Sequence, residues 1–201
     1  IKFTLFHMKH LHLPDTGGNH IAHMTYHFSV YEHTLVLKES ELIKRKFIVL
    51  KDANGDICAF TDFHRYIRSA KNQYVRKVTD DGNSRHYYVV KLLNYVFFDK
   101  YHIKKLNDMT IEMVSCFLND YGKALLPDDS CERTKATVIT CIKTIIDFLD
   151  EFIKENKENC KIKQSELYKT VTTRNKRGNI VKKKVPAFDV TYSGKVKNIF
   201  R

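Results

Sequence analysis

The sequence lacks any apolar run long enough to cross a membrane. Its longest apolar-rich stretch, Tyr87 to Phe98, is interrupted by Lys91 and Asn94. This stretch is shorter than the ~20 residues that a spanning helix needs. No basic segment is followed by an apolar stretch and a small-residue cleavage site. We therefore expect neither a membrane span nor a signal peptide.

Cysteines are few and scattered. The five are Cys58, Cys116, Cys131, Cys141 and Cys160, and no two of them form a C-x-x-C pair. An odd number at wide spacing excludes a secreted disulfide framework and a zinc ribbon. Free thiols in a reducing, cytoplasmic environment are the better interpretation.

Catalytic motifs are also missing. The sequence contains no P-loop, no dinucleotide-binding glycine motif, no H-E-x-x-H and no G-x-S-x-G. Cys58 and His64 could form a thiol–imidazole pair, but their spacing is not specific. We expect no catalytic residue and no cofactor in these 201 residues.

Seven of the ten histidines lie within residues 1–46, which raises the question of a metal site. They are His7, His10, His12, His20, His23, His27 and His33. No cysteine or carboxylate falls among them at ligand spacing, and their positions fit no single strand or helix face. We interpret them as surface or half-buried residues of a β-containing N-terminal segment, and expect no metal.

Acidic residues are scarce at the C-terminal end. Residues 161–201 contain twelve Lys and Arg but only Glu166 and Asp189 as acids, so their net charge is 12 − 2 = +10. The first 160 residues carry (35 − 12) − (23 − 2) = +2. A basic block of this kind indicates a polyanionic partner such as nucleic acid. The alternative is a solvated tail that keeps the chain in solution.

Hydrophobic spacing and turn residues predict the order of the elements. They are a strand at 27–37, a hairpin at 47–60 around Asn54-Gly55, a short helix at 63–70, a loop at 72–83, helices at 84–101, 108–122 and 130–156, and a basic hairpin or extended linker at 167–185. We expect a mainly α fold, α+β overall: an orthogonal bundle of about four helices with β-hairpin-like segments before and after it. The predicted segments are 1–46, 47–160 and 161–201.

The polar side of the third long helix is unusual. It combines three hydroxyls with three cations: Arg133, Thr134, Lys135, Thr137, Thr140 and Lys143. Short hydroxyls let a helix approach a duplex closely and donate to phosphate oxygens, while Arg and Lys add charge. The alternative is an ordinary exposed helix face.

Motifs in all three long helices occur in a recognisable order. The first helix opens with Ser84, Tyr88 and Leu92, the second runs from Asp108-Met109-Thr110-Ile111-Glu112 to Phe117-Leu118, and the third carries Thr137, Thr140, Lys143 and Phe148-Leu149. This order resembles the N-terminal core-binding (SAM-like) domain of tyrosine recombinases, the phage integrase family.

The resemblance implies one half of a clamp on duplex DNA. The residues expected to contact DNA are Ser84, Arg85, Tyr88, Lys91, Arg133, Thr134, Lys135, Thr137, Thr140 and Lys143. It also implies self-association on DNA through parts outside these residues. The family's His-x-x-Arg motif is missing. We therefore expect the non-catalytic N-terminal portion of a site-specific recombinase that acts in DNA integration.

Two other functions remain open. Amphipathic helices need no ligand to bury their apolar faces, so a helical protein-interaction or scaffold module with a basic tail is the alternative. A small RNA-binding protein has only the charge in its favour, since no aromatic RNA-binding motif is present.

Overall fold

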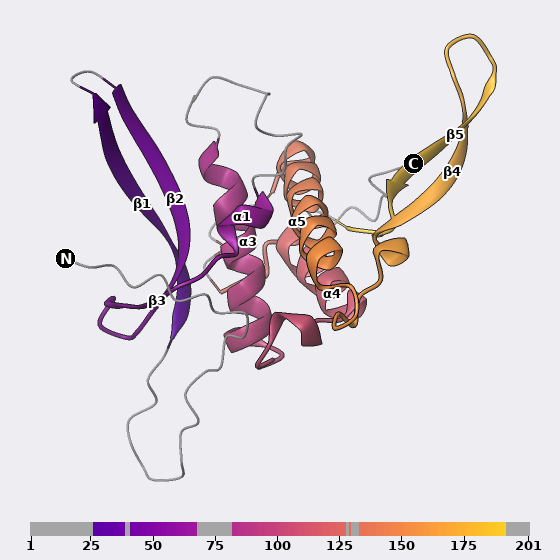
Figure 1. The fold of residues 1–201 in the computed structure, drawn as a ribbon. Coiled ribbons are helices and arrows are strands. Elements are labelled where there is room, and N and C mark those ends of the chain that lie inside the picture. The colour runs from indigo at the N-terminus through magenta and orange to yellow at the C-terminus, as the bar shows by residue number, and fades with distance from the viewer. Residues whose placement is uncertain (1–25, 39–40, 68–81, 128, 130–132, 192–201) are drawn as a thin grey trace. The chain divides into compact units, whose positions relative to one another are not determined.

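The computed structural model describes residues 26–38, 41–67, 82–127, 129 and 133–191. The chain divides into two compact units, residues 1–106 and 107–201, and each contains helices and antiparallel strands (Figure 1). The predicted mainly α fold, a bundle of about four helices, is wrong: the described residues form an α+β mix with two small sheets and show no helical bundle. The division falls inside the predicted segment 47–160.

Unit 1 is built on a three-stranded antiparallel sheet. Its strands are β1 (His27–Lys38), β2 (Glu41–Lys51) and β3 (Ile57–Phe60), in the spatial order β1-β2-β3. β1 confirms the strand that we predicted at 27–37. It is rich in aromatic and β-branched residues, which suit a pleated and half-buried surface.

A tight turn joins β2 to β3, as the Asn-Gly pair predicts. The Asp52 carboxylate accepts hydrogen bonds from the backbone N–H groups of Asn54 (2.9 Å) and Asp56 (3.0 Å). Gly55 has φ +87°, a conformation that residues with a Cβ rarely adopt. The hairpin predicted at 47–60 is therefore confirmed.

The first long helix packs on this sheet, which is one reason why no bundle forms. It is α3 (Gly82–Asn94), and the Asn94 amide accepts a hydrogen bond from Phe28 N–H (2.6 Å) and donates one to Phe28 C=O (3.0 Å). The Phe28 side chain is buried against the rings of Phe97 (5.3 Å between centroids) and Phe98 (5.5 Å). The first long helix and the turn that follows it are therefore packed against β1, through Phe28.

The helix predicted at 84–101 differs at both ends. It begins at Gly82, inside the predicted loop 72–83, whose other residues lie mostly outside the described part of the chain. After Asn94 it widens into η1 (Tyr95–Asp99), a π-helical turn in which Lys100 N–H donates to Tyr95 C=O (3.0 Å). Hydrophobic spacing cannot reveal such a turn, because the change lies in the hydrogen-bond pattern.

The short helix predicted at 63–70 is present as α1 (His64–Ile67), and its residues after 67 lie outside the described part. Phe63, which precedes the helix, and Tyr66 and Ile67 within it are buried. The hydroxyl of Thr61, just before this helix, donates a hydrogen bond to Ile48 C=O on β2 (2.7 Å).

Unit 2 contains two long helices, α4 (Ile111–Gly122) and α5 (Lys135–Asn156), which pack on each other. Two short 3-10 turns, η2 (Leu106–Asp108) and η3 (Gln164–Leu167), lie before α4 and after α5. The Thr110 hydroxyl accepts a hydrogen bond from Met113 N–H (3.5 Å) and so caps α4. The buried side chains of this pair include Val114, Phe117, Leu118, Tyr121, Val138, Ile142, Ile145, Leu149 and Phe152.

A chain segment beyond the last strand runs along α4. The Asn119 carboxamide oxygen accepts hydrogen bonds from the N–H (3.1 Å) and the hydroxyl (3.3 Å) of Thr191. A Cβ on Gly122 would overlap the Thr191 carbonyl oxygen and lie 3.2 Å from Val190 Cγ1. Gly122 is the last residue of α4, as predicted, but Ala124 takes the left-handed conformation (φ 56°). Because Gly122 has no Cβ, the segment at 190–191 can pack closely against the end of α4.

Candidate nucleic-acid interface

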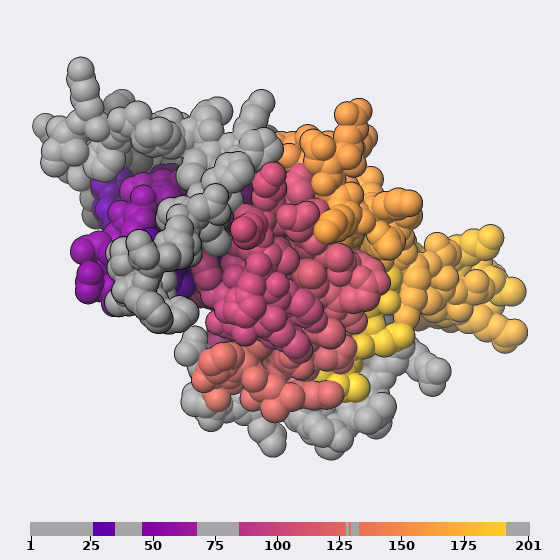
Figure 2. All heavy atoms as spheres, turned by 90° about the horizontal axis from the view of Figure 1, so that it is seen from below, coloured from indigo at the N-terminus to yellow at the C-terminus, as the bar shows by residue number. Residues whose placement is uncertain are grey.

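A two-stranded antiparallel ribbon extends from the helices of unit 2 (Figures 1 and 2). Strand β4 (Tyr168–Arg174) pairs with β5 (Ile180–Pro186), which places Tyr168 opposite Pro186 and Arg174 opposite Ile180. Of the two forms that the sequence allows, hairpin or extended linker, the structure has the hairpin. We call β4, β5 and their connecting turn, residues 168–186, the basic ribbon.

The turn at the tip of the basic ribbon is held by one side chain. The Asn175 carboxamide oxygen accepts hydrogen bonds from the N–H groups of Arg177 (2.9 Å) and Asn179 (3.0 Å). Gly178 has φ +80°, where glycine is favoured. These local interactions fix the backbone that carries Lys176 and Arg177.

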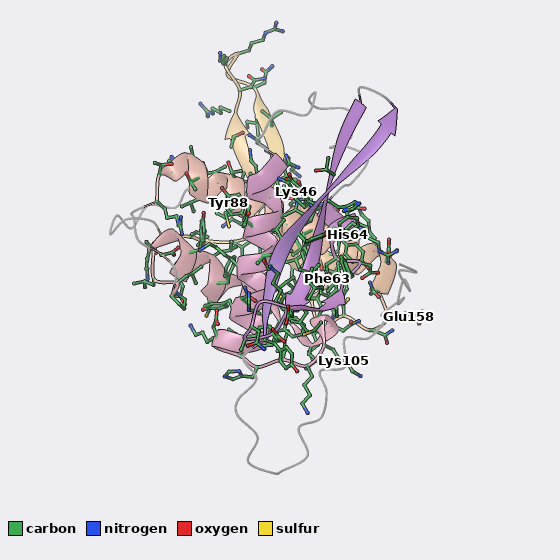
Figure 3. All side chains as sticks on the ribbon, turned by 90° about the vertical axis from the view of Figure 1, so that its left-hand side faces the viewer. Lys46, Phe63, His64, Tyr88, Lys105 and Glu158 are labelled. Atoms are coloured by element: carbon green, nitrogen blue, oxygen red, sulfur yellow. The ribbon has the colours of Figure 1, made fainter. Side chains whose placement is uncertain are left out.

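The basic ribbon carries charge of one sign only. It contains no acidic residue and seven cations: Lys169, Arg174, Lys176, Arg177, Lys182, Lys183 and Lys184. Nitrogen-tipped side chains spread outward from it in Figure 3. Charges of one sign on a projecting element produce a strong local potential, which attracts a polyanion.

The two faces of the basic ribbon differ in exposure. On one face every residue beyond the root is exposed; we call this the exposed ribbon face, and it comprises Thr170, Thr172, Arg174, Ile180, Lys182 and Lys184. On the opposite face Val185 is buried and Val171 is half-buried. Lys169 on that face pairs with Asp189 (2.9 Å). A ligand can therefore cover the exposed ribbon face along its whole length.

The root of the basic ribbon packs against α5. Lys184 Nζ lies 4.2 Å from the centroid of the Tyr168 ring. Burial raises the pKa of Tyr168, and the nearby carboxylates of Asp150 and Asp147 raise it further. Partial burial acts to raise the pKa of Asp150, but hydrogen bonds from Lys154 and Gln164 hold it below its ordinary value. The acidic groups named in these contacts thus lie at the root of the basic ribbon.

The three threonines predicted to contact DNA have partners within α5 itself. The Thr134 hydroxyl caps the helix by accepting from Thr137 N–H (3.2 Å), and the two hydroxyls lie 2.8 Å apart. The Thr140 hydroxyl donates to Ala136 C=O (2.9 Å). Because Thr134 is the cap, α5 begins at Lys135 and not at the predicted Ser130. These bonds explain the hydroxyl-rich pattern without a ligand.

Arg133 likewise has interactions within unit 2. Its guanidinium pairs with the buried carboxylate of Asp129 and lies 4.3 Å from the centroid of the Tyr121 ring. Asp129 also accepts a hydrogen bond from Leu126 N–H (3.3 Å). Arg133 therefore connects the loop after α4 to the start of α5.

The other predicted DNA contacts divide between the two units. Lys135 and Lys143 are exposed on α5. In unit 1, Arg85, Tyr88 (labelled in Figure 3) and Lys91 are half-buried on α3. Ser84 lies within the first turns of α3 rather than at its cap. A DNA-binding role for these ten residues remains a prediction.

The cations of the basic ribbon are absent from that set of ten predicted contacts. The signal was present, because the net charge of +10 is concentrated in residues 161–201. The sequence left open whether these segments pair or extend as a linker, and the observed pairing of β4 with β5 places alternate residues on one exposed face.

Replacing Thr134 by alanine should lower the free energy of unfolding by about 1 kcal/mol, because α5 loses the acceptor for an N–H group in its first turn. Urea denaturation followed by circular dichroism measures this. Thr140→Ala is the matched control: it removes a hydroxyl bonded only to its own helix, and alanine favours helix, so stability should be unchanged or slightly higher. Equal losses in both variants would contradict the capping role.

Metal binding and membrane insertion find no support in the described residues. Within them, no group of three or more His, Cys, Asp or Glu could hold a metal ion. Of the seven N-terminal histidines, only His27 and His33 lie in that part of the chain. None of the helices described is both long and apolar enough to span a membrane.

Comparisons of the chain with protein-family models, with curated proteins and with solved structures found no match.

Proposed function

We propose that this chain binds duplex DNA and that the basic ribbon is its principal contact. One observation carries the proposal: seven cations and no acid lie on an element that projects from unit 2 and is exposed along one whole face. Lysine and arginine that neutralise phosphates release condensed counterions, which is the main source of sequence-independent affinity for DNA.

The dimensions of the basic ribbon support a duplex as the ligand. A two-stranded β-ribbon fits the major groove of B-DNA, which is about 12 Å wide. Seven residues in each strand, at about 3.3 Å per residue, extend roughly 23 Å. The ribbon can therefore follow the groove for most of one turn, which spans about 34 Å.

The recombinase relationship is part of the same proposal. The ordered motifs of α3, α4 and α5 support it, and so does a DNA-binding element that follows them in the chain. In this proposal the chain is the non-catalytic, DNA-holding part of a cytoplasmic site-specific recombinase. Strand cleavage and self-association on DNA belong to parts outside these residues.

Fluorescence anisotropy with a labelled duplex tests DNA binding. The chain should bind tightly at low salt, and the logarithm of the association constant should fall linearly with the logarithm of salt concentration. Each phosphate contact contributes a slope of about −0.9, so seven cations give at most about −6. Duplex RNA of the same length should bind more weakly, because its major groove is deep and narrow. No DNA binding at the lowest salt would refute the proposal.

A further inference from the structure

One large apolar side chain lies at the tip of the basic ribbon, among the cations. Ile180 is 70% exposed, more than any other large hydrophobic residue that the structure describes. It faces Arg174 across the two strands. A single exposed apolar residue is common on protein surfaces. Ile180 differs because it lies on the exposed ribbon face, where a bound ligand would contact it.

The exposed ribbon face combines the groups that proteins use to recognise base edges. Arg174 and Ile180 lie nearest the tip, and Thr172 opposite Lys182 and Thr170 opposite Lys184 follow toward the root. In the major groove arginine pairs with guanine, hydroxyls bond to several bases, and apolar side chains contact the C5-methyl group of thymine. Phosphate binding alone would not use an exposed isoleucine.

We propose that the exposed ribbon face enters the major groove and that Ile180 contacts thymine methyl groups there. This inference rests on the proposed DNA binding and adds a base preference to it. The minor groove is about 6 Å wide, and the ribbon strands alone are about 4.8 Å apart before side chains are added. The minor groove also lacks the thymine methyl group. The major groove therefore fits both the ribbon and its apolar residue.

Val181 provides an internal control. It is the neighbour of Ile180, it is also apolar and 42% exposed, and it lies on the opposite face of the ribbon, across from Thr173. A contact made by any apolar residue at the tip would involve both side chains. A contact made by the exposed ribbon face involves only Ile180.

The experiment compares two duplexes that differ only in the thymine methyl group. One is an alternating adenine–thymine duplex of about 20 base pairs, two turns of B-DNA, and the other has uracil in place of thymine. Both have the same number of phosphates, so the electrostatic contribution is matched. Burying a methyl-sized group contributes a factor of about four in affinity. The wild-type chain should prefer the thymine duplex about fourfold for each methyl group contacted.

Two variants test which side chain causes this preference. Ile180→Ala should bind both duplexes equally and keep the wild-type salt slope, because no charge changes. Val181→Ala should retain the preference. Both side chains are exposed, and circular dichroism with thermal melting checks that each variant is folded.

Each outcome points to a different conclusion. If the wild-type chain binds both duplexes with equal affinity, the methyl contact is refuted and DNA binding stands. If Val181→Ala abolishes the preference and Ile180→Ala does not, the opposite face enters the groove and the assignment to Ile180 is refuted. If neither duplex binds at low salt, the proposed function itself fails.

Discussion

Replacing Lys182, Lys183 and Lys184 together by glutamine is expected to weaken duplex binding about 10- to 100-fold at low salt and to flatten the salt slope by about 2 to 3. The three lysines are exposed on β5, so neutralising them removes positive charge from the basic ribbon without opening the core. The exception is the Lys184 contact with Tyr168, whose loss costs about 0.5–1 kcal/mol of stability.

A matched variant tests whether the loss of affinity depends on the position of the lysines or only on the net charge. Lys157, Lys161 and Lys163 are also exposed in unit 2, and changing all three to glutamine lowers the charge equally. This control should lose much less affinity. A third variant, Lys135→Gln with Lys143→Gln, tests the predicted face of α5. If the β5 variant binds like the wild-type chain, the basic ribbon is not the contact. If only the α5 variant loses affinity, the DNA site lies on that helix.

Replacing Gly122 by alanine is expected to destabilise unit 2 by about 1–3 kcal/mol, the usual result of forcing an extra group into packed surroundings. The new Cβ would overlap a backbone carbonyl, that of Thr191, which cannot rotate away as a flexible side chain can. Helix propensity alone predicts the opposite sign, because alanine favours helix over glycine by about 1 kcal/mol. The sign of the measured change therefore distinguishes close packing from helix propensity.

Urea denaturation gives the free energy of unfolding for this test. Asn119→Ala is the companion variant, since it removes the two hydrogen bonds from Thr191 without a clash. If both variants release the same segment, combining them should cost less than the sum of the single losses. Gly122→Ala with wild-type or higher stability would show that the segment at 190–191 does not pack on α4 as described.

Elements fixed by neighbouring residues could be predicted from the sequence. The turn at Asn54-Gly55 depends on contacts between residues close together in the chain, and it was found as predicted. The partner of α3 could not be predicted, because Asn94 and Phe28 are 66 residues apart in the chain. An amphipathic helix buries its face equally well on strands or on helices, so its pattern does not identify the partner.

The candidate site shows the same contrast. The excess of positive charge after residue 160 is a property of composition and was evident. The threonines of α5 seemed suited to phosphate, but the same short hydroxyls cap helices and bond to carbonyls one turn back. Only the three-dimensional structure distinguishes a hydroxyl that caps a helix from one that is available to a phosphate. The face of the ribbon that Ile180 occupies could not be predicted either, because it depends on the register of β4 against β5.

The two-stranded sheet of β4 and β5 has a further consequence for how copies of this chain behave at high concentration. In a sheet of two strands, each strand has one unpaired edge that could accept a strand from another molecule. Three successive lysines place charge on both faces of β5. Pairing with a second ribbon would bring like charges together, so repulsion protects the chain against edge-to-edge aggregation.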